Sequence, residues 1–513
     1  MKPFIISHFS LSLSPSTFSA STLFFSPHRL HSNPLLHIHP TLNKPPPLAN
    51  SQEEPTRKIG PQATIRMTTT TTTATTLNEQ NHKKPILRSI KFNSFFFSSA
   101  IFLHLTQLLV FPFVILSDST FTRHLRLKYN CLARKTFAII LILITQIFAP
   151  TNLVLTSDHS IDLNQVVRRD KNGNIIAIDL PSHSIIMANH QIYADWLYVW
   201  SLAYLADIHS ALIIILKASL KWVPLVGPAM QMFSFIFLNR SWATDKKDLT
   251  IQLDQLADQT YNPTMSSLNK IGLLIFPEGT LVSPLTRPAS KKYAEKCGVD
   301  DLKHCLLPRS TGSLFCMRAL SQKIPDLKLI DLTIGYSGVP ADGHGQDYYT
   351  LQSIFGYGRP PPKVHIHIKV IPVSEIPIGH VVPRPSTPNP ISVSIPTNDL
   401  PVTIDEKKRT PKELSSMNDP SPEEVDRFDS WLRGLWVEKD MLLDQFYAHG
   451  RFDSAPLDLS HKHLSHHSLE KRAPTPALEW PIQLKNYRDL NRTFGLALPG
   501  VFLVACAFKL LFF

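Results

Sequence analysis

Two long apolar stretches precede the central part of the chain. Residues 95–116 and 136–155 each have about the length, roughly 20 residues, that a bilayer-spanning helix needs. A third apolar stretch covers residues 494–513. Basic residues flank the first stretch on both sides, so the positive-inside rule assigns no orientation. The pattern predicts membrane attachment by a helical hairpin, which either crosses the bilayer twice or dips into one leaflet, and by a C-terminal hydrophobic helix.

Residues 156–372 alternate short apolar runs typical of buried strands with longer runs of helical periodicity. This alternation predicts an α/β fold, a sheet flanked by helices with its chemistry at the strand ends. The expected strands are 184–188, 211–216, 235–238, 272–276, 329–335 and 364–370. The expected helices are 192–206, 246–261 and 311–321.

The remaining segments are polar, apart from one amphipathic stripe. Residues 1–90 are rich in Ser, Pro, His and Thr, and we expect a low-complexity extension or an organelle presequence. Ser421 and Glu424 form a candidate capping box ahead of an apolar stripe, which predicts a helix packed on the α/β domain. The expected organisation is an extension (1–90), a membrane hairpin (91–155), an α/β domain (156–372), a disordered Pro/Ser/Thr-rich insertion (373–420), an amphipathic helix (421–449), a polar linker (450–493) and a membrane segment (494–513).

Charge and cysteine usage narrow the classes of partner. The formal charge of +12 favours nucleic acid, an anionic membrane surface or a phosphorylated substrate. A nucleic-acid binder would leave the hydrophobic segments unexplained, so we expect no nucleic acid. The 5 cysteines show no C-x-x-C spacing, which argues against a disulfide framework and a zinc site, and we expect no metal.

Polar residues suited to acid–base chemistry follow two of the expected strands. His190 comes at the end of one strand, and Asp195 follows on the next helix. A histidine can act as a general base, and a neighbouring carboxylate can fix its tautomer. Alone, a pair at this spacing is more often incidental than catalytic. The run Phe276–Thr280, Phe-Pro-Glu-Gly-Thr, follows another strand, and taken alone it fits a tight turn with convergent polar groups and a plain strand-to-loop turn equally well.

Three basic residues are candidates for binding phosphate. Arg240 follows the strand 235–238, where its guanidinium can hold a phosphate with two hydrogen bonds or form a salt bridge with Asp245. Lys217 opens a K-x-x-L-x-x-x-P-x-x-G run, although a lysine at a membrane surface is usually just solvated. Arg309 follows Pro308, and we expect it at another strand end.

In this order and separation, the motifs resemble those of the 1-acylglycerol-3-phosphate acyltransferase family of glycerolipid acyltransferases. The family order is an H-x4-D block, a block ending in F-[IL]-x-R, an F-P-E-G-T block and a later Pro block. The second block departs slightly here, because Leu238 and Asn239 lie between Phe237 and Arg240. Further features resemble the lysocardiolipin and long-form lysophosphatidate branch: N-H-Q-x-x-x-D-W from Asn189, P-R-S-T-G from Pro308, His365 with His367, and Trp431 with Trp436.

The resemblance implies an acyltransferase-type sheet and acyl transfer from acyl-CoA, a co-substrate rather than a bound cofactor, to a lysophospholipid hydroxyl. His190, oriented by Asp195, would deprotonate that hydroxyl, which attacks the thioester directly. It implies a lipid bilayer as partner, with the endoplasmic reticulum as first choice and a mitochondrial membrane as second; the acceptor and the oligomeric state stay open. The substrate-binding residues would be Arg240, Glu278, Gly279 and Thr280, with Lys217 and Arg309 as further candidates.

Three other functions compete with this one. A membrane scaffold with a decayed acyltransferase-like domain should have lost the His, Asp or Glu of the motifs, and all are present. A lipid desaturase could use His463, His466 and His467, but it needs several histidine boxes beside its membrane helices. A serine hydrolase is disfavoured because the sequence contains no G-x-S-x-G.

Overall fold

A computed structural model describes residues 86–106, 120–260, 269–382, 419–452, 477–486 and 488–491. The predicted C-terminal membrane segment 494–513, the histidine tract at His463–His467 and most of the extension 1–90 lie outside these residues.

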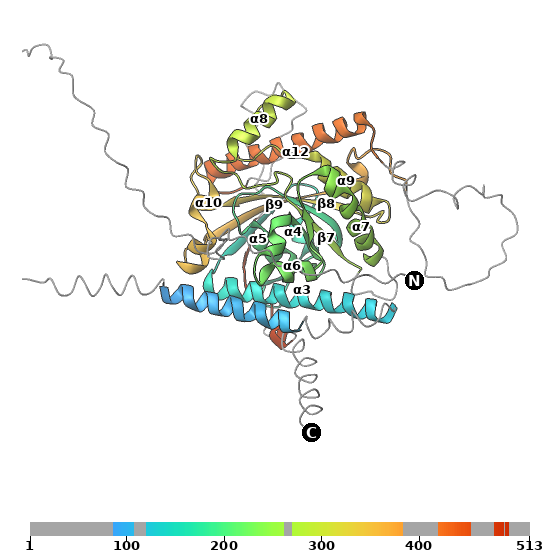
Figure 1. Cartoon of the computed structure of the whole chain (residues 1–513). Helices are drawn as coiled ribbons and strands as arrows, with labels where there is room; N and C mark the ends of the chain where they lie inside the picture. The colour runs from blue at the N-terminus through green and yellow to red at the C-terminus, as the bar shows by residue number, and fades with distance from the viewer. Residues whose placement is uncertain are drawn as a thin grey trace, which may run out of the picture. The chain divides into compact units, whose positions relative to one another are not determined.

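An 8-stranded, mostly parallel sheet organises the described residues, in the order β10-β1-β9-β8-β4-β7-β5-β6 (Figure 1). Neighbouring strands from β8 to β6 run parallel, whereas β9 is antiparallel to β8 and β10 is antiparallel to β1. The fold is therefore α/β, and all six strands expected from the sequence are confirmed. The strands are β1 Asn152–Ser157, β4 His183–Ala188, β5 Leu212–Lys217, β6 Ile236–Leu238, β7 Ile271–Ile275, β8 Lys328–Tyr336, β9 Lys363–Pro372 and β10 Leu478–Pro481, with β2 Val167–Arg169 and β3 Ile175–Ile178 in a separate pair.

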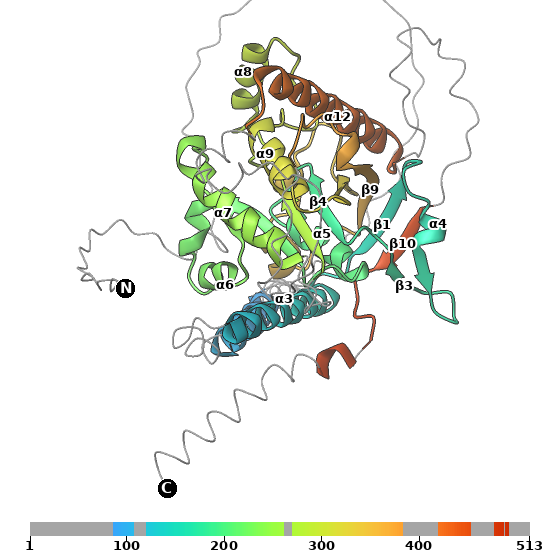
Figure 2. The same ribbon diagram turned by 90° about the vertical axis from the view of Figure 1, so that its right-hand side faces the viewer.

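Helices cover both faces of this sheet. Side chains of a strand point alternately to opposite faces, so Ile186 and Ala188 of β4 pack with α3 and α5, while Ile185 and Met187 pack with α7, α9 and α12. Figures 1 and 2 accordingly show α3 and α12 on opposite sides. The three expected helices are confirmed as α5, α7 and α9. Besides the helix Ile86–Thr106, the described residues include the α-helices α3 Thr120–Phe148, α4 Leu163–Val166, α5 Asp195–Leu205, α6 Val226–Met232, α7 Trp242–Thr260, α8 Arg287–Cys297, α9 Ser310–Ser321, α10 Gly345–Tyr348 and α12 Pro422–His449.

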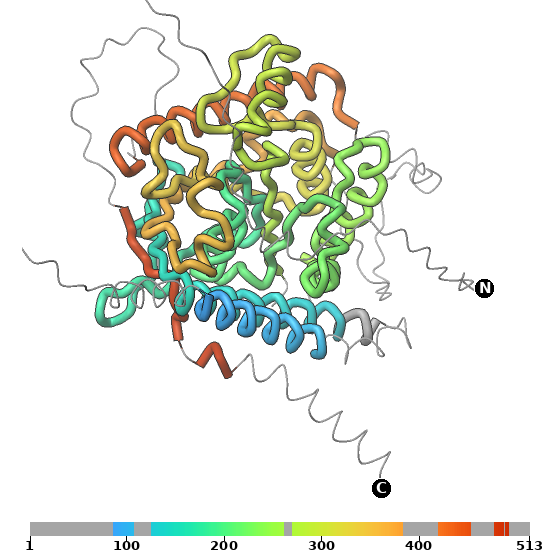
Figure 3. The backbone as a smooth tube through the Cα atoms, turned by 60° about the vertical axis from the view of Figure 1, so that its left-hand side comes forward, coloured from blue at the N-terminus to red at the C-terminus, as the bar shows by residue number. Residues whose placement is uncertain are grey.

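The helix Ile86–Thr106 and α3 lie side by side (Figures 1 and 3). The Phe92 and Phe148 ring centroids are 5.7 Å apart, so the first helix begins beside the end of α3. At its other end, His104 contacts the Leu225 carbonyl of the α/β domain. Both helices are long and apolar enough to cross a membrane. In the most apolar stretch of α3, 61% of the residues are buried, whereas in that of the first helix only 11% are buried. The α/β domain therefore covers much of α3.

The expected boundary of the second apolar segment, 136–155, differs from the observed one. Helix α3 ends at Phe148, and Pro150 follows. Proline cannot continue a helix without losing a hydrogen bond. The next residues, Asn152–Ser157, form β1, which pairs with β9 and β10 inside the sheet. The run from Asn152 onward is apolar because it is a buried strand.

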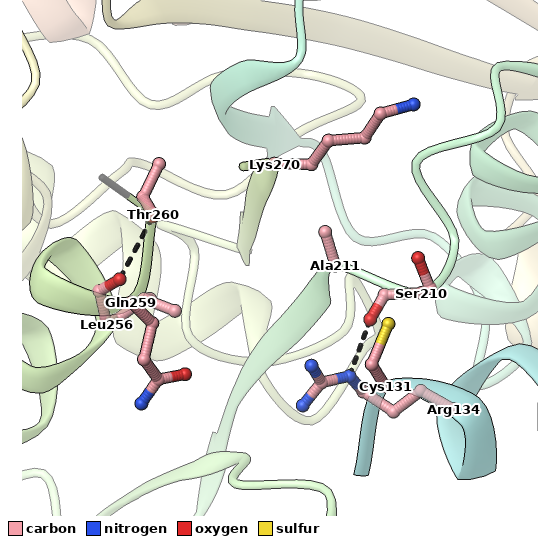
Figure 4. Close-up of a pocket in the computed structure, with 8 residues that line it drawn as sticks. All are labelled: Cys131, Arg134, Ser210, Ala211, Leu256, Gln259, Thr260 and Lys270. Carbon is pink, nitrogen blue, oxygen red and sulfur yellow. Dashed lines mark hydrogen bonds between the residues drawn. The ribbon is translucent and has the colours of Figure 1, made fainter. Parts of the chain in front are cut away.

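Arg134 anchors α3 to the α/β domain. Its guanidinium donates hydrogen bonds to the carbonyls of Ser210 at 2.7 Å and Phe233 at 2.9 Å; Figure 4 shows the bond to Ser210. A buried charge needs such partners, because it loses its hydration. The cavity beside Arg134, about 20 Å³, is large enough for about one water molecule and too small for a lipid.

Two segments expected to be unstructured contribute to the core. The expected linker 450–493 contains β10, whose Trp480 is buried and whose backbone pairs with β1. The expected insertion 373–420 begins with packed residues: Ile376 and Ile378 are buried, and Arg318 donates to the carbonyl of His380 at 3.0 Å. Short runs of alternating apolar and polar residues within these two polar segments are therefore packed against the folded domain. Residues 383–418 lie outside the described part of the chain.

Candidate active site

Four of the predicted site residues lie at or just after the carboxyl ends of neighbouring parallel strands. His190 comes after β4, Glu278 after β7, and Arg240 after β6, while Lys217 is the last residue of β5. In the sheet these strands stand in the order β4-β7-β5-β6 and run in the same direction. The carboxyl ends of parallel strands meet at one edge, where α/β proteins commonly bind their ligands.

His190 and Asp195 form a hydrogen-bonded pair. Nδ1 of His190 donates to Oδ2 of Asp195 at 2.7 Å. The imidazole also stacks on Phe276, with ring centroids 4.3 Å apart. The Asp195 side chain is fully buried, whereas that of His190 is 20% exposed. Because Nδ1 is bound to the carboxylate, Nε2 is the nitrogen available to a substrate.

Three further donors fix the Asp195 carboxylate. The backbone N–H groups of Gln191 and Ile192 donate to Oδ2 at 2.7 and 3.1 Å, and the Tyr336 hydroxyl donates to Oδ1. Asp195 is also the first residue of α5, where the helix dipole favours a negative charge. Tyr336, which the sequence analysis missed, is buried at the end of β8. An aromatic residue at the end of a long apolar strand predicts burial, and nothing in that pattern predicts the contact with Asp195.

Asn189 locks the loop before His190 to β8. Its side-chain amide donates to the Ile334 carbonyl at 3.0 Å and accepts the Ile334 N–H at 2.7 Å. With one hydrogen bond donated and one accepted, the Asn189 side chain pairs with the backbone of β8 as a neighbouring strand would. The position of His190 therefore depends on β8 as well as on β4.

Glu278 lies inside the protein, only 4% exposed. Its Oε1 accepts the backbone N–H of His190 at 3.1 Å and the indole N–H of Trp436 at 3.2 Å, and its Oε2 accepts the N–H of Leu306 at 3.0 Å. Burial raises the pKa of Glu278 to about 8, although these donors act in the opposite direction. Protein donors contact both carboxylate oxygens, and a role in binding substrate stays a prediction.

The loop after Glu278 turns sharply and returns to His190. Gly279 has a φ of +72°, a left-handed conformation that favours glycine. Its N–H donates to the Phe276 carbonyl at 2.9 Å, and the N–H of Val282 donates to the His190 carbonyl at 3.1 Å. Gly279 and Thr280 are both half-buried in this loop, next to the His–Asp pair.

The Arg240 side chain points to the same loop, and among the contacts described its guanidinium does not pair with Asp245, although the Arg240 backbone N–H donates to that carboxylate. Its guanidinium donates to the carbonyl of Gly279. The Asp245 carboxylate instead accepts the backbone N–H groups of Asn239 at 2.9 Å and Ser241 at 3.1 Å. Arg240 has a φ of +66°, so its backbone is held in a conformation that side chains disfavour. The Arg240 guanidinium therefore contacts this loop instead of forming the salt bridge with Asp245 that was the alternative to phosphate binding.

Arg309 lies near Arg240, but not at a strand end. It is the N-cap residue of α9, and its guanidinium lies over the Tyr293 ring, 4.7 Å from the centroid. Burial, and then the charge of Arg309, lower the pKa of Arg240. Two guanidinium groups that repel each other favour a bound anion between them. Lys217 is exposed at the end of β5, beside β6.

The His365 and His367 strand belongs to the core. His365 contacts the Ser337 hydroxyl at 3.1 Å, and His367 contacts that of Thr156 at 3.1 Å. Burial lowers the pKa of each histidine to about 4, so both are neutral at physiological pH. In the part of the chain that the structure describes, no group of three or more His, Cys, Asp or Glu side chains is arranged to hold a metal ion.

Comparison with protein families gives two matches. The Acyltransferase family matches residues 174–337, which contain the His–Asp pair and the Phe276–Thr280 loop. The family of the acyltransferase C-terminus matches residues 418–479, which contain α12. No solved structure matches the chain.

Curated relatives match larger parts of the chain. A 2-acyl-1-lysophosphatidylinositol acyltransferase of Saccharomyces cerevisiae is 31% identical over 348 residues, which cover 63% of this chain and 76% of the relative. Lysophosphatidylinositol acyltransferase 10 of Caenorhabditis elegans is 32% identical over 209 residues, 39% of this chain and 48% of the relative. Lysocardiolipin acyltransferase 1 of Gallus gallus is 31% identical over 194 residues, 38% and 47% of the two chains. With its α/β sheet, its motif order and these similarities, the chain belongs to the glycerolipid acyltransferase family and is an acyltransferase.

Proposed function

We propose that this enzyme transfers an acyl group from acyl-CoA to a free hydroxyl of a lysophospholipid. The observation that carries the proposal is the His190–Asp195 pair, 2.7 Å apart at the sheet edge that Arg240 also approaches. The relatives are named for lysophosphatidylinositol, 1-acyl-sn-glycerol-3-phosphate and lysocardiolipin. All such acceptors combine a glycerol hydroxyl with a phosphate. A general base beside basic residues suits that combination.

In the proposed reaction, His190 is the general base. Its Nε2 takes the proton of the acceptor hydroxyl as the oxygen attacks the thioester carbonyl. The new ester C–O bond forms, the C–S bond breaks, and the thiolate of CoA leaves with the proton from the imidazolium. Asp195 holds the imidazole and stabilises its charged form. A cysteine nucleophile is unnecessary, and burial raises the pKa of the nearby Cys305 thiol well above its usual range.

The acceptor phosphate is proposed to bind between Arg240 and Arg309. Both guanidinium groups present several N–H donors, and Arg309 stands at the N-terminus of α9, where backbone N–H groups and the helix dipole attract anions. Gly279 and Thr280 would line the same site from the opposite loop. Lys217 would add a further positive charge at the end of β5.

The bilayer is proposed as the second partner, contacted through the helix Ile86–Thr106. Its outward side exposes Ile90, Ile101 and Leu105. Both of its ends contact the α/β domain, so the helix runs along the domain instead of leaving it. This arrangement favours a hairpin that lies in one leaflet over two full crossings. The endoplasmic reticulum stays the first choice of membrane and the mitochondrion the second.

A lysophospholipid panel tests the proposed function. Membranes from cells that express the full chain should incorporate labelled acyl groups from acyl-CoA into at least one lysophospholipid. The same membranes with His190→Ala at equal protein level provide the background. If no acceptor in a panel of lysophosphatidate, lysophosphatidylinositol and lysocardiolipin exceeds that background, the proposal is wrong.

Tyr336→Phe tests the support of the His–Asp pair. The change removes one of four hydrogen bonds to Asp195, so we expect kcat to fall about 2- to 10-fold, the range for about 0.5–1.5 kcal/mol. Both KM values should stay the same. Tyr349→Phe is a matched control, because the Tyr349 hydroxyl donates to the Ser337 carbonyl instead. An equal loss of kcat in the Tyr336→Phe and Tyr349→Phe enzymes would contradict a specific role of Tyr336 in supporting the His–Asp pair.

A further inference from the structure

Glu278 joins three separate segments of the chain. Its carboxylate accepts hydrogen bonds from His190 in the β4–α5 loop, from Leu306 in the segment before α9, and from Trp436 in the middle of α12. A buried carboxylate is stable only while such donors surround it. Loss of the indole N–H would leave Oε1 with the His190 N–H alone. The position of His190 is therefore coupled to α12.

Asp440, one turn further along α12, holds the segment before α9. Its Oδ2 accepts the N–H of Lys303 at 2.9 Å, and its Oδ1 accepts those of His304 at 2.7 Å and Cys305 at 2.9 Å. Three successive N–H groups that converge on one carboxylate form a rigid anion-binding turn. This segment leads directly to Arg309, whose own N–H donates to the Pro277 carbonyl at 3.0 Å.

Helix α12 is itself fixed on the sheet. Nζ of Lys439 lies 2.7 Å from Oδ1 of Asp331 and donates to the Leu332 carbonyl of β8 at 2.7 Å. Phe446 fills the space above Gly335, where a Cβ atom would lie 2.9 Å from the ring. Figures 1 and 2 show α12 on the side of the sheet that also carries α9. These contacts set the register of α12 against the strand that carries Tyr336.

We propose that α12 is a positioning element of the active site, in which Trp436 acts on His190 through Glu278, and Asp440 acts on Arg309 through residues 303–306. The inference rests on the proposed function, in which His190 is the base and Arg309 binds the acceptor phosphate. It assigns Glu278 a positioning role, distinct from the predicted contact with substrate. Helix α12 then supports catalysis and acceptor binding by two routes, which meet where Leu306 donates to Glu278.

The first route is tested with Trp436→Phe, which keeps an aromatic ring and removes the N–H donor. We expect kcat to fall about 3- to 10-fold, the scale of one lost hydrogen bond, with both KM values within about twofold. Trp431→Phe is the matched control, because Trp431 lies on the same helix and packs against Phe428, with ring centroids 5.5 Å apart. A Trp436→Phe enzyme with the kcat of the Trp431→Phe enzyme would overturn this route.

Glu278→Met provides a second variant of similar size for the same route, and it removes both acceptor oxygens. If Trp436 acts only through Glu278, the double variant Trp436→Phe/Glu278→Met should be no slower than Glu278→Met alone. Additive losses would show that Trp436 affects the rate by another path, and would contradict the inference. The rates of the single and double variants are compared at a temperature at which all of these enzymes are folded. The comparison therefore remains valid even if Trp436→Phe lowers the melting temperature.

The second route predicts a different kinetic signature. Asp440→Asn replaces the oxygen that accepts the Lys303 N–H with an amide donor, so we expect the acceptor KM to rise about 3- to 10-fold and kcat to change less. Asp444→Asn is the control, because the Asp444 carboxylate contacts only side chains of this segment in the described structure, those of Lys303 and His304. Equal KM values for the two variants would exclude a specific role of Asp440.

Hydrogen exchange on the detergent-solubilised full chain separates this inference from the proposed function. Trp436→Phe should speed amide exchange in peptides covering residues 189–192 and 304–307, and Trp431→Phe should not. This coupling is measured without substrate, so it holds even if His190 were not the base. Unchanged exchange in both peptides would overturn the inference while leaving the acyltransferase assay to judge the proposed function.

Discussion

Replacing His190 with alanine should lower the rate of acyl transfer by at least about 100-fold and at most about 10,000-fold, the usual share of a general base. The reason is geometric, since Nδ1 is held by Asp195 at 2.7 Å and Nε2 remains for the acceptor hydroxyl. Without the imidazole, the hydroxyl attacks the thioester without giving up its proton. The measurement is the initial rate with saturating acyl-CoA and lysophospholipid at equal protein level.

The chain contains its own control for this experiment. His183, at the opposite end of β4, also forms a hydrogen-bonded pair with an aspartate, Nδ1 lying 2.7 Å from Oδ2 of Asp326. His183→Ala should leave the rate within about threefold of wild type, because that end of the strand is remote from the carboxyl edge of the sheet. A His190→Ala enzyme with the activity of the His183→Ala enzyme would contradict the assignment of His190 as the base.

The parts of the fold that the sequence predicts are those with a local physical signal. Strands covered on both faces must be apolar at almost every position, so β4 and β7 stand out as short unbroken runs. The residue types at the ends of such runs then identify His190 and the Phe276–Thr280 loop. The helix start at Ser421 was equally clear, and the capping box with Glu424 is present in the structure.

The contacts that complete the site have no local signal. Tyr336 reaches Asp195 from 141 residues away, and Trp436 reaches Glu278 from 158 residues away. Each is an aromatic residue in an apolar run, and its pattern predicts only burial. The same limit explains β1, because a strand that follows an apolar helix after a proline has the composition of a longer helix. The contacts of these residues depend on which distant segments pair in the fold. A single sequence carries no local pattern that predicts this pairing.

Arg240→Lys should raise the KM for the lysophospholipid acceptor by roughly 10- to 150-fold, equivalent to about 1.5–3 kcal/mol for a hydrogen bond to a charged group. A guanidinium holds two phosphate oxygens in one plane, whereas an ammonium acts as a point charge. The KM for acyl-CoA should change less than about twofold. The comparison requires full saturation curves for both substrates, together with the melting temperature of each enzyme.

The observed bond from Arg240 to the Gly279 carbonyl gives this experiment a specific competitor. If Arg240 only braces that loop, the lysine variant should lose kcat, and both KM values and the melting temperature should change together. An acceptor without phosphate, such as a monoacylglycerol, separates the two roles. If Arg240 binds the phosphate, wild type and Arg240→Lys should use the monoacylglycerol equally poorly. The rise in KM caused by the substitution is then confined to acceptors that carry a phosphate. A penalty of the same size for both acceptors would leave Arg240 with a structural role alone.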